Sequence, residues 1–511
     1  MRRLPYGKTP DGMRALRLGP GLTEGGTARV AYKTGKAPLF LVPLLVGALL
    51  SSLAFLLSLS VDLSDGARVA IVGSAVAGPI TIILILRNFV LGVYLFGAVL
   101  PFENQVIFGS LASSTKAIAF LMFASCALTL LRDRKLFARL WHLLHNPVVI
   151  SLFALSLWCL ASTVWAYDQG AALIKASTFL GLFGLTLVVA LLDRGQVTLL
   201  WIVLATSSFL SILYGFVGYL LRPAPDEPYD TPAGVDPTRV SSAGADPNDY
   251  AGFILIVFLV VYYGLPRRFI LARYALAIVT FLGIFASQSR AGLVALIVTP
   301  LLGLFGPALK ARFAIRSLVM LGLAALVLIG FIYYSAHLMG GEDVRMGEGV
   351  LKRYAALSQI RNENTWTGRL DLWQGALEII SSHPLLGIGA GNFFYGASRV
   401  SAEAARLENV TGTGAVAHNM FLSVWSELGT VGLGLFLGML VLAFQQALTL
   451  VRRNSNLGAS LVFGLVAYII MGMTLTWEHE ELPYLLYGSI LSLQLHETTR
   501  HKTQTLSAKN N

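Results

Sequence analysis

Three side chains suited to binding and activating a phosphate-bearing substrate stand at the edges of apolar stretches. Arg290 joins two such stretches, Arg369 follows Thr367-Gly368 in a long polar segment, and His418 precedes a further apolar stretch. The planar fork of an arginine matches phosphate oxygens, and a helix start expected at Thr367 adds positive potential near Arg369. A histidine has the usual pKa for taking a proton from a hydroxyl. The pattern indicates an anion-binding site with a general base.

Each of these residues also has a structural interpretation. Arg290 can extend to lipid head groups, although an arginine at membrane depth costs about 2.5–3.5 kcal/mol on insertion scales. Arg369 can form a surface pair with Glu363 or Asp371, and a lone histidine such as His418 is more often structural than catalytic. The residues taken singly leave both interpretations open.

Three further residues are candidates for a supporting role. Glu427 lies inside an apolar stretch, where a carboxylate is costly and therefore either functional or paired with an arginine of a neighbouring helix. Asn419 stands beside His418. Arg239 lies ahead of Asp246-Pro247-Asn248, a run that first of all predicts a turn and a helix start.

The composition identifies the class of protein that must position these residues. Of 511 residues, 55% are hydrophobic and 13% are charged, with a mean hydropathy of +0.69, whereas soluble chains carry about 25% charged residues. Long apolar stretches recur from Leu39 to Leu495. They predict an all-α, polytopic transmembrane helical bundle rather than a barrel, which would show short alternating segments.

Charge and cysteine content exclude other classes. The formal net charge is +11, but the basic residues lie mostly between the apolar stretches, where they set topology and meet lipid head groups rather than nucleic acid. The two cysteines, Cys126 and Cys159, both lie in apolar stretches and form neither a disulfide framework nor a thiolate metal site.

A membrane span needs about 20 apolar residues, and the sequence predicts 12 to 14 of them. We expect spans near 38–60, 68–86, 88–102, 115–131, 147–166, 172–192, 197–221, 249–264, 269–288, 291–308, 316–337, 420–448, 457–476 and 482–496.

The charge distribution orients these spans. Four connections are basic, and the positive-inside rule places them with both termini in the cytoplasm. The basic residues in question are Arg132, Arg134, Lys135, Arg139, Arg267, Arg268, Arg273, Lys310, Arg312, Arg316, Arg452 and Arg453. The acidic 222–248 loop and the long 338–419 loop then fall on the opposite side.

The expected organisation is therefore a basic, disordered cytoplasmic tail (1–37), a bundle (38–337), the long loop (338–419), C-terminal spans (420–497) and a second cytoplasmic tail (498–511). Within the long loop, Leu370, Trp373, Leu377 and Ile380 recur at helical spacing. They predict a short amphipathic helix on the membrane surface or on the bundle, with Thr367 as its N-cap. His383-Pro384 ends it, since a residue before proline resists the α region.

Other motifs are weaker. The glycine-rich run 387–391 lacks the strand-then-helix setting of a nucleotide fold and predicts a turn. The acidic run 478–481 contains His479 but has no second ligand cluster at convincing spacing. There is no Walker motif, so ATP use is not expected, and no inverted repeat with broken spans, which weakens a transporter interpretation.

Together these residues resemble the O-antigen ligase and O-antigen polymerase family of bacterial membrane glycosyltransferases. Four short motifs in a fixed order, between about residues 240 and 450, carry the resemblance. They are Ser289-Arg290-Ala291-Gly292, then Thr367-Gly368-Arg369 with Trp373, then His383-Pro384-Leu385-Leu386-Gly387-Ile388-Gly389, and finally His418-Asn419 followed by Glu427 and Gly429.

The resemblance implies transfer of a glycan from undecaprenyl diphosphate at the periplasmic face of the bacterial inner membrane, with no metal, ATP or other cofactor. Ligases transfer it to lipid A–core oligosaccharide, and polymerases to another lipid-linked repeat unit. Arg290 and Arg369 then correspond to the diphosphate-binding arginines and His418 to the catalytic base. Arg239, Asn419 and Glu427 would support them.

Alternatives remain open at this point. The length of the chain and its basic tail depart from the expected ligase pattern and leave ligase against polymerase undecided, and the family also serves capsule, exopolysaccharide and protein-glycan transfer. A transporter of lipid-linked sugars predicts charged residues deep in several spans, for which Glu427 and Lys175 are the candidates. A non-enzymatic scaffold is the third possibility.

Overall fold

The computed structural model describes residues 80–105, 114–221, 239–241, 246–305, 311–337, 364–401, 404–405, 415–453 and 455–509. The described residues form helices and connections and contain no strand, which confirms the predicted all-α membrane bundle. The predicted tail 1–37 and most of the 222–248 loop lie outside them.

Most helices match predicted spans, with boundaries that differ by a few residues. Before the long loop, the structure contains α3 (Phe89–Val99), η1 (Leu100–Gln105), α4 (Ser114–Arg132), α5 (Arg134–Leu144), α6 (Pro147–Ala161), η2 (Ser162–Val164), α7 (Gln169–Ala190), α8 (Arg194–Leu221), α9 (Pro247–Gly264), η3 (Arg267–Phe269), α10 (Ile270–Ser287), α11 (Arg290–Phe305) and α12 (Ala311–His337). After it come α14 (Asn364–Ser382), α15 (Phe393–Ala397), α17 (Met420–Arg452), α18 (Asn456–Gly472) and α19 (Glu481–Lys509).

Within the described residues, eight helices are long and apolar enough to cross a membrane, and three shorter apolar helices start near residues 89, 290 and 456. The predicted span 38–60 and most of 68–86 lie outside the described residues. The predicted C-terminal tail also differs, because α19 continues as a helix to Lys509.

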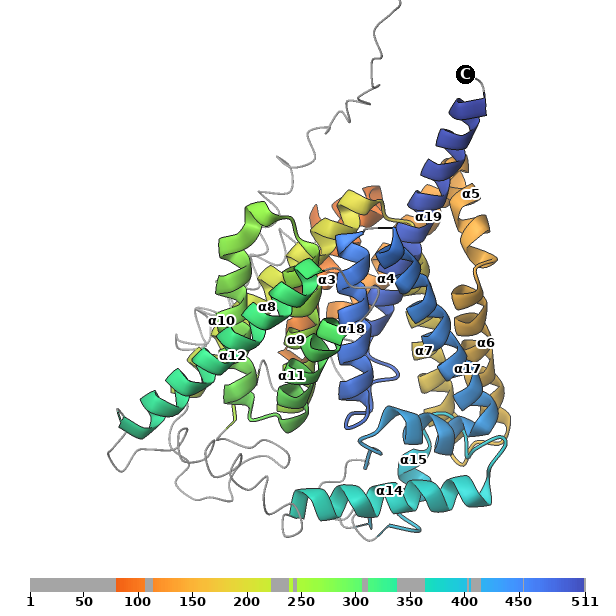
Figure 1. The fold of residues 1–511 in the computed structure, drawn as a ribbon. Helices are drawn as coiled ribbons and strands as arrows, with labels where there is room; N and C mark the ends of the chain where they lie inside the picture. The colour runs from red at the N-terminus through yellow and green to blue at the C-terminus, as the bar shows by residue number, and fades with distance from the viewer. Residues whose placement is uncertain are drawn as a thin grey trace, which may run out of the picture. The chain divides into compact units, whose positions relative to one another are not determined.

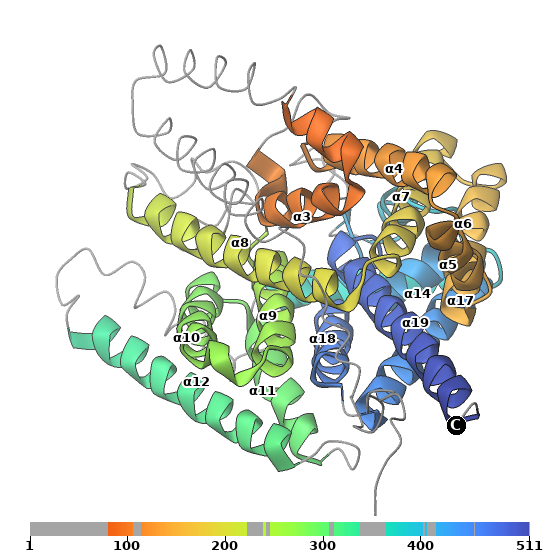
Figure 2. The same ribbon diagram turned by 90° about the horizontal axis from the view of Figure 1, so that it is seen from above.

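The long helices pack side by side in two groups (Figures 1 and 2). In one group α9 packs against α8, α10 and α11, and α12 packs against α10 and α11. In the other, α6 packs against α7 and α17, and α7 packs against α19. Helix α18 contacts α9, α11, α17 and α19, so it joins the two groups.

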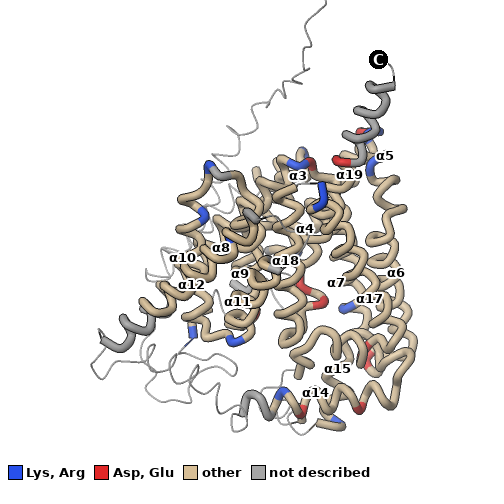
Figure 3. The backbone as a smooth tube through the Cα atoms, viewed as in Figure 1, with Lys and Arg blue, Asp and Glu red and all other residues tan. Residues whose placement is uncertain are grey.

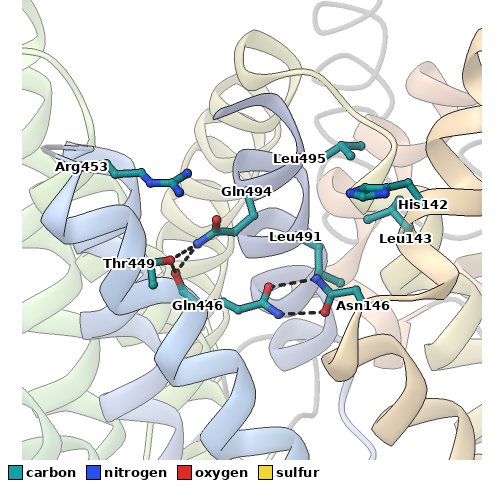
Figure 4. A pocket seen from close by; sticks show the side chains of 9 residues that line it. All are labelled: His142, Leu143, Asn146, Gln446, Thr449, Arg453, Leu491, Gln494 and Leu495. Carbon is teal, nitrogen blue, oxygen red and sulfur yellow. Dashed lines mark hydrogen bonds between the residues drawn. The ribbon is translucent and has the colours of Figure 1, made fainter. Parts of the chain in front are cut away.

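Polar contacts between segments far apart in sequence support the second group. The amides of Asn146 and Gln446 bond each other, with N···O distances of 3.4 and 2.8 Å. Gln494 donates to the carbonyl of Gln446 at 2.6 Å and to the hydroxyl of Thr449. These residues line a pocket with about 700 Å³ of open space between the N-terminus of α6, α17 and α19 (Figure 4).

Helix α14 lies crosswise to the bundle at one end of it (Figure 1). It ends at Ser382, as predicted from His383-Pro384, but it begins at Asn364, so Thr367 is inside the helix rather than its N-cap. Leu370 and Leu377, two members of the predicted apolar stripe, are 50% and 51% exposed. Ile380, another member of that stripe, is buried. The buried face of α14 also carries Leu372, Ala376 and Ile379, which form one apolar cluster with Phe393 of α15 and Ala417 before α17.

A helix that the sequence did not predict lies at the opposite end. The basic connection after Arg132 folds into α5, capped by the side chain of Asp133. Lysines and arginines of α5, and of the connections after α9 and α17, lie at this end, away from α14 (Figures 1 and 3). The exposed Phe137 and Trp141 share one face of α5, which is the pattern of a helix in the membrane interface.

Helix α17 is broken at Gly429, whose φ of 68° lies in the left-handed region. A Cβ added there would lie 2.1 Å from the carbonyl oxygen of Leu385, so the break lets the chain after α14 approach the helix backbone. Thr430 uses this space, since its N–H and hydroxyl donate to the carbonyl of Pro384 at 2.9 and 2.8 Å.

Replacing Gly429 with alanine should destabilise the protein by about 2 kcal/mol or more, because it adds both a left-handed alanine and a backbone clash. Thermal unfolding of the purified full chain measures the effect. Gly434→Ala is the matched control, since a Cβ at Gly434 meets nothing within 4 Å in the same helix. Equal unfolding temperatures for the two variants would contradict this view of the break.

Candidate functional site

The first turn of α9 connects several of the candidate residues. Asp246 caps the helix by accepting the N–H of Asn248 at 2.7 Å, and Pro247 takes the first helical position, as the sequence predicts. The side-chain oxygen of Asn248 accepts from Arg239 Nη2 at 3.0 Å. Asp249 Oδ1 accepts from the indole of Trp477 at 2.7 Å. One helical turn therefore joins the segment before α9 to the connection between α18 and α19.

Arg239 braces the turn that leads to Arg290. It is buried, and its Nε donates to the carbonyl of Ser287 at 2.7 Å. The N–H of Val240 donates to the carbonyl of Ala286 at 3.0 Å. Gln288 has a φ of 54°, a left-handed conformation that is rare outside glycine and concentrates at functional sites. The arrangement assigns Arg239 a structural role in holding this turn.

Arg290 begins α11 directly after this turn and is half-buried. The hydroxyl of Ser289 accepts the N–H of Gly292 at 3.2 Å and so caps the helix. A Cβ on Gly292 would lie 3.0 Å from the Cβ of Ala251, so α11 starts in close contact with the beginning of α9. Arg290 therefore stands at the end of the bundle where the α9 turn lies.

His418 is held by backbone contacts from two directions. Trp373 of α14 donates its indole N–H to the carbonyl of Ala417 at 3.0 Å. The N–H of His418 donates to the hydroxyl of Thr476 at 3.1 Å. The residue has a φ of 47°, again left-handed. Asn419 caps α17, because its side chain accepts the N–H groups of Phe421 and Leu422. Asn419 thus fixes the helix start that presents His418.

The electrostatic surroundings of His418 link it to Arg369 and to α9. Burial lowers the pKa of His418 to about 4, and the positive charge of Arg369 adds to this effect, while Asp246 opposes it. Asp249 also lies within electrostatic range of Arg369. The imidazole is therefore neutral near pH 7, the form in which a histidine accepts a proton.

Arg369 lies in the second turn of α14, because the helix begins at Asn364. This corrects the prediction that it stands in the first turn, where unbonded N–H groups would join it in a phosphate cradle. Its side chain is half-buried.

Glu427 fastens the long loop to α17. It is 6% exposed, and its two carboxylate oxygens accept the N–H groups of Gly391 at 2.7 Å and Phe393 at 3.1 Å. The carbonyl of Glu427 also accepts the N–H of Gly389 at 2.9 Å. The glycine-rich run is thus a turn, as predicted, wrapped on the carboxylate. These contacts correct the idea that Glu427 pairs with or fixes an arginine of a neighbouring helix.

A second buried cluster holds the α18–α19 connection. Lys175 of α7 contacts Glu478 Oε1 at 3.1 Å and His479 Nδ1 at 2.9 Å. Ser423 donates to the same glutamate oxygen at 3.0 Å, and Tyr484 donates to its backbone carbonyl at 2.7 Å. Burial raises the pKa of Glu478, but the Lys175 cation and the hydrogen bond and charge of His479 together outweigh burial and hold that pKa below its usual range. The intramembrane lysine is therefore paired.

Sequence reasoning named Asn248 only as part of a turn, and it missed Asp249, Thr476 and Trp477. In the sequence these residues are only polar positions at the ends of apolar stretches. Their spacing does not show which ends lie together in the structure. No group of three or more His, Cys, Asp or Glu side chains is placed to hold a metal in the part of the chain that the structure describes.

Comparison with known families identifies the domain that contains four of these residues. Residues 275–437, which include Arg290, Arg369, His418 and Glu427, match the family model described as O-antigen ligase. The chain carries an O-antigen ligase domain. This confirms the resemblance drawn from the motifs. The family covers O-antigen ligases and polymerases, and the match includes about a third of the chain. A search of curated proteins found no match.

The matched region of this O-antigen ligase domain extends from α10 into α17. It therefore includes both membrane helices and the long loop between α12 and α17. It omits Arg239, the first turn of α9 and the α18–α19 connection. Two hydrogen bonds connect these outside segments to the matched region: Arg239 donates to the carbonyl of Ser287, and Thr476 accepts the N–H of His418.

Replacing Thr476 with valine should reduce glycan transfer about tenfold, because the His418 N–H loses its acceptor and an unpaired buried donor costs about 1–3 kcal/mol. A rate measurement on purified protein checks this. Thr474→Val is the control, since Thr474 bonds only the nearby Met471 carbonyl. If both variants transfer at the same rate, Thr476 does not position His418.

Proposed function

We propose that this protein transfers a glycan from undecaprenyl diphosphate to an acceptor hydroxyl at the periplasmic face of the bacterial inner membrane, as an O-antigen ligase does. The single observation that carries the proposal is the proximity of Arg369 and His418, a cation and a neutral imidazole, beside the α9 turn. The matched family and the four ordered motifs support the same chemistry.

In this proposal Arg290 and Arg369 bind the diphosphate. The bond from the anomeric carbon to the diphosphate oxygen breaks as the acceptor oxygen attacks, and negative charge grows on the leaving diphosphate. Fixed cations that meet developing charge lower the barrier by several kcal/mol. A diphosphate stabilised in this way needs neither ATP nor a metal to leave.

His418 takes the proton of the acceptor hydroxyl as its oxygen attacks. A positioned base of this kind contributes about 10²- to 10⁴-fold. Trp373 and Thr476 hold the backbone on either side of the histidine amide, so the ring is presented from a fixed position. Arg239, Asn419 and Glu427 support the three reactive residues through the turns that they hold.

The proposed acceptor is lipid A–core or a related glycan. A polymerase would use the same donor, cations and base but would transfer the glycan to a second lipid-linked repeat unit. The difference lies in which acceptor reaches His418.

Reconstitution of the purified chain with lipid-linked glycan and candidate acceptors tests the proposal. Arg290→Ala, Arg369→Ala and His418→Ala should each reduce transfer about 100-fold or more, while the protein still inserts. Transfer to lipid A–core identifies a ligase, and chain growth on the carrier identifies a polymerase. Normal transfer by His418→Ala would exclude it as the base, and an ion-driven flux of lipid-linked sugar without either product would exclude the enzyme.

The pH dependence of transfer provides a second test. Because the pKa of His418 is lowered to about 4, the base stays deprotonated above that pH, and protonation removes it only below. The rate should therefore be nearly flat from roughly pH 5 to 8 and fall toward pH 4. A rate that halves near pH 6.5 would mean that an unperturbed histidine, or another group, is the base.

A further inference from the structure

A groove lies among α8, α9 and α10, which stand side by side (Figure 2). Its cavity volume is about 290 Å³. Its walls are apolar side chains such as Ile202, Phe209 and Leu276, together with a single charged residue, Arg273. This composition matches sites that take mostly apolar ligands with one polar contact.

Arg273 is unusual among the described arginines. It lies in the first turn of α10 and is only 5% exposed. Its Nε and Nη2 atoms are buried and have no hydrogen-bond partner among the described residues. Buried guanidinium nitrogens without an acceptor are strongly unfavourable, so these two atoms point to a ligand that supplies one.

The surroundings of Arg273 supply more positive charge rather than an acidic partner. Arg316 of α12 lies within electrostatic range, as do the hydroxyls of Tyr262 and Tyr274. Arg316 itself donates to the carbonyl of Tyr263 at 2.8 Å. The described acidic side chains form no ion pair with Arg273. Two neighbouring cations in an apolar setting therefore favour an anion between or beside them.

The groove lies near the basic end of the bundle, where a lipid head group would meet positive charge. Arg273 lies just after η3 (Arg267–Phe269), at the basic end of the bundle and away from α14 (Figures 1 and 3). Arg268 is exposed there and stacks its guanidinium over the ring of Phe269 at 5.0 Å from the centroid. From this end the apolar walls on α8 and α10 follow the helices toward the hydrocarbon region.

We propose that this groove binds an anionic phospholipid, with the phosphate on Arg273 and an acyl chain along α8 and α10. Basic pockets between membrane helices bind such head groups, and the apolar walls account for the rest of the molecule. The site lies at the opposite end of the bundle from Arg369 and His418, so it is separate from the proposed glycan-transfer chemistry.

The test measures lipid binding to the purified, delipidated full chain by native mass spectrometry and by thermal shift. Dioleoylphosphatidylglycerol should bind saturably and raise the unfolding temperature, whereas dioleoylphosphatidylcholine and inorganic phosphate should not. Arg273→Met should weaken phosphatidylglycerol binding about tenfold or more. Arg452→Met, an exposed arginine at the same end, is the charge-matched control and should change the affinity less than twofold.

Two further variants keep the result independent of folding defects. Without lipid, Arg273→Met should unfold at the same temperature as the wild type or higher, because it removes an uncompensated buried cation. Ala275→Trp should fill the groove and reduce binding, while Ile278→Trp, on the same helix outside the groove, should not. Equal shifts from the two phospholipids, an equal shift from inorganic phosphate, or undiminished binding to Arg273→Met would overturn the proposal.

Discussion

The first turn of α9 is the point through which the site is assembled. Asn248 and Asp249 are polar groups at the edge of a membrane bundle, where an unpaired amide or carboxylate is costly. Arg239 satisfies the first and Trp477 the second. Each of these partners then holds a further segment: Arg239 holds the turn before Arg290, and the connection that carries Trp477 also accepts the His418 amide through Thr476. Satisfying two polar side chains thus brings α10, α11, α17 and the α18–α19 connection to one place.

The second constraint is the break in α17. Because Gly429 leaves room for the chain after α14, the loop reaches the buried carboxylate of Glu427 and gives it two N–H donors. These contacts attach the segment after α14 to α17. Helix α14 lies crosswise to the bundle, and its Trp373 donates to the carbonyl of Ala417. In this way the loop helix and the start of α17 are fixed relative to each other, and the charge of Arg369 acts on His418. The arrangement is a lid attached to the bundle rather than an independent domain.

Hydrophobic periodicity predicted the helices well, because long apolar runs admit few other structures in a membrane. It did not predict α5, whose basic residues resembled a loop although Leu136 and Leu143 are buried at helical spacing. Motif order identified Arg290, Arg369 and His418 as candidates, but it could not show their partners. The partner of Glu427 is a pair of backbone amides, and backbone amides carry no residue signature. The pairing of Asp249 with Trp477 crosses 228 positions of sequence, which no local pattern encodes.

We propose that Arg290 of α11 and Arg369 of α14 bind one diphosphate between them. A cryo-electron microscopy structure of the full chain in nanodiscs with undecaprenyl diphosphate-linked glycan tests it most directly. We expect the diphosphate in contact with both Arg290 and Arg369, with the His418 imidazole facing the anomeric carbon from the acceptor side. A diphosphate bound to one arginine alone, or beside Lys175 or Arg273 with His418 remote from the sugar, would contradict it.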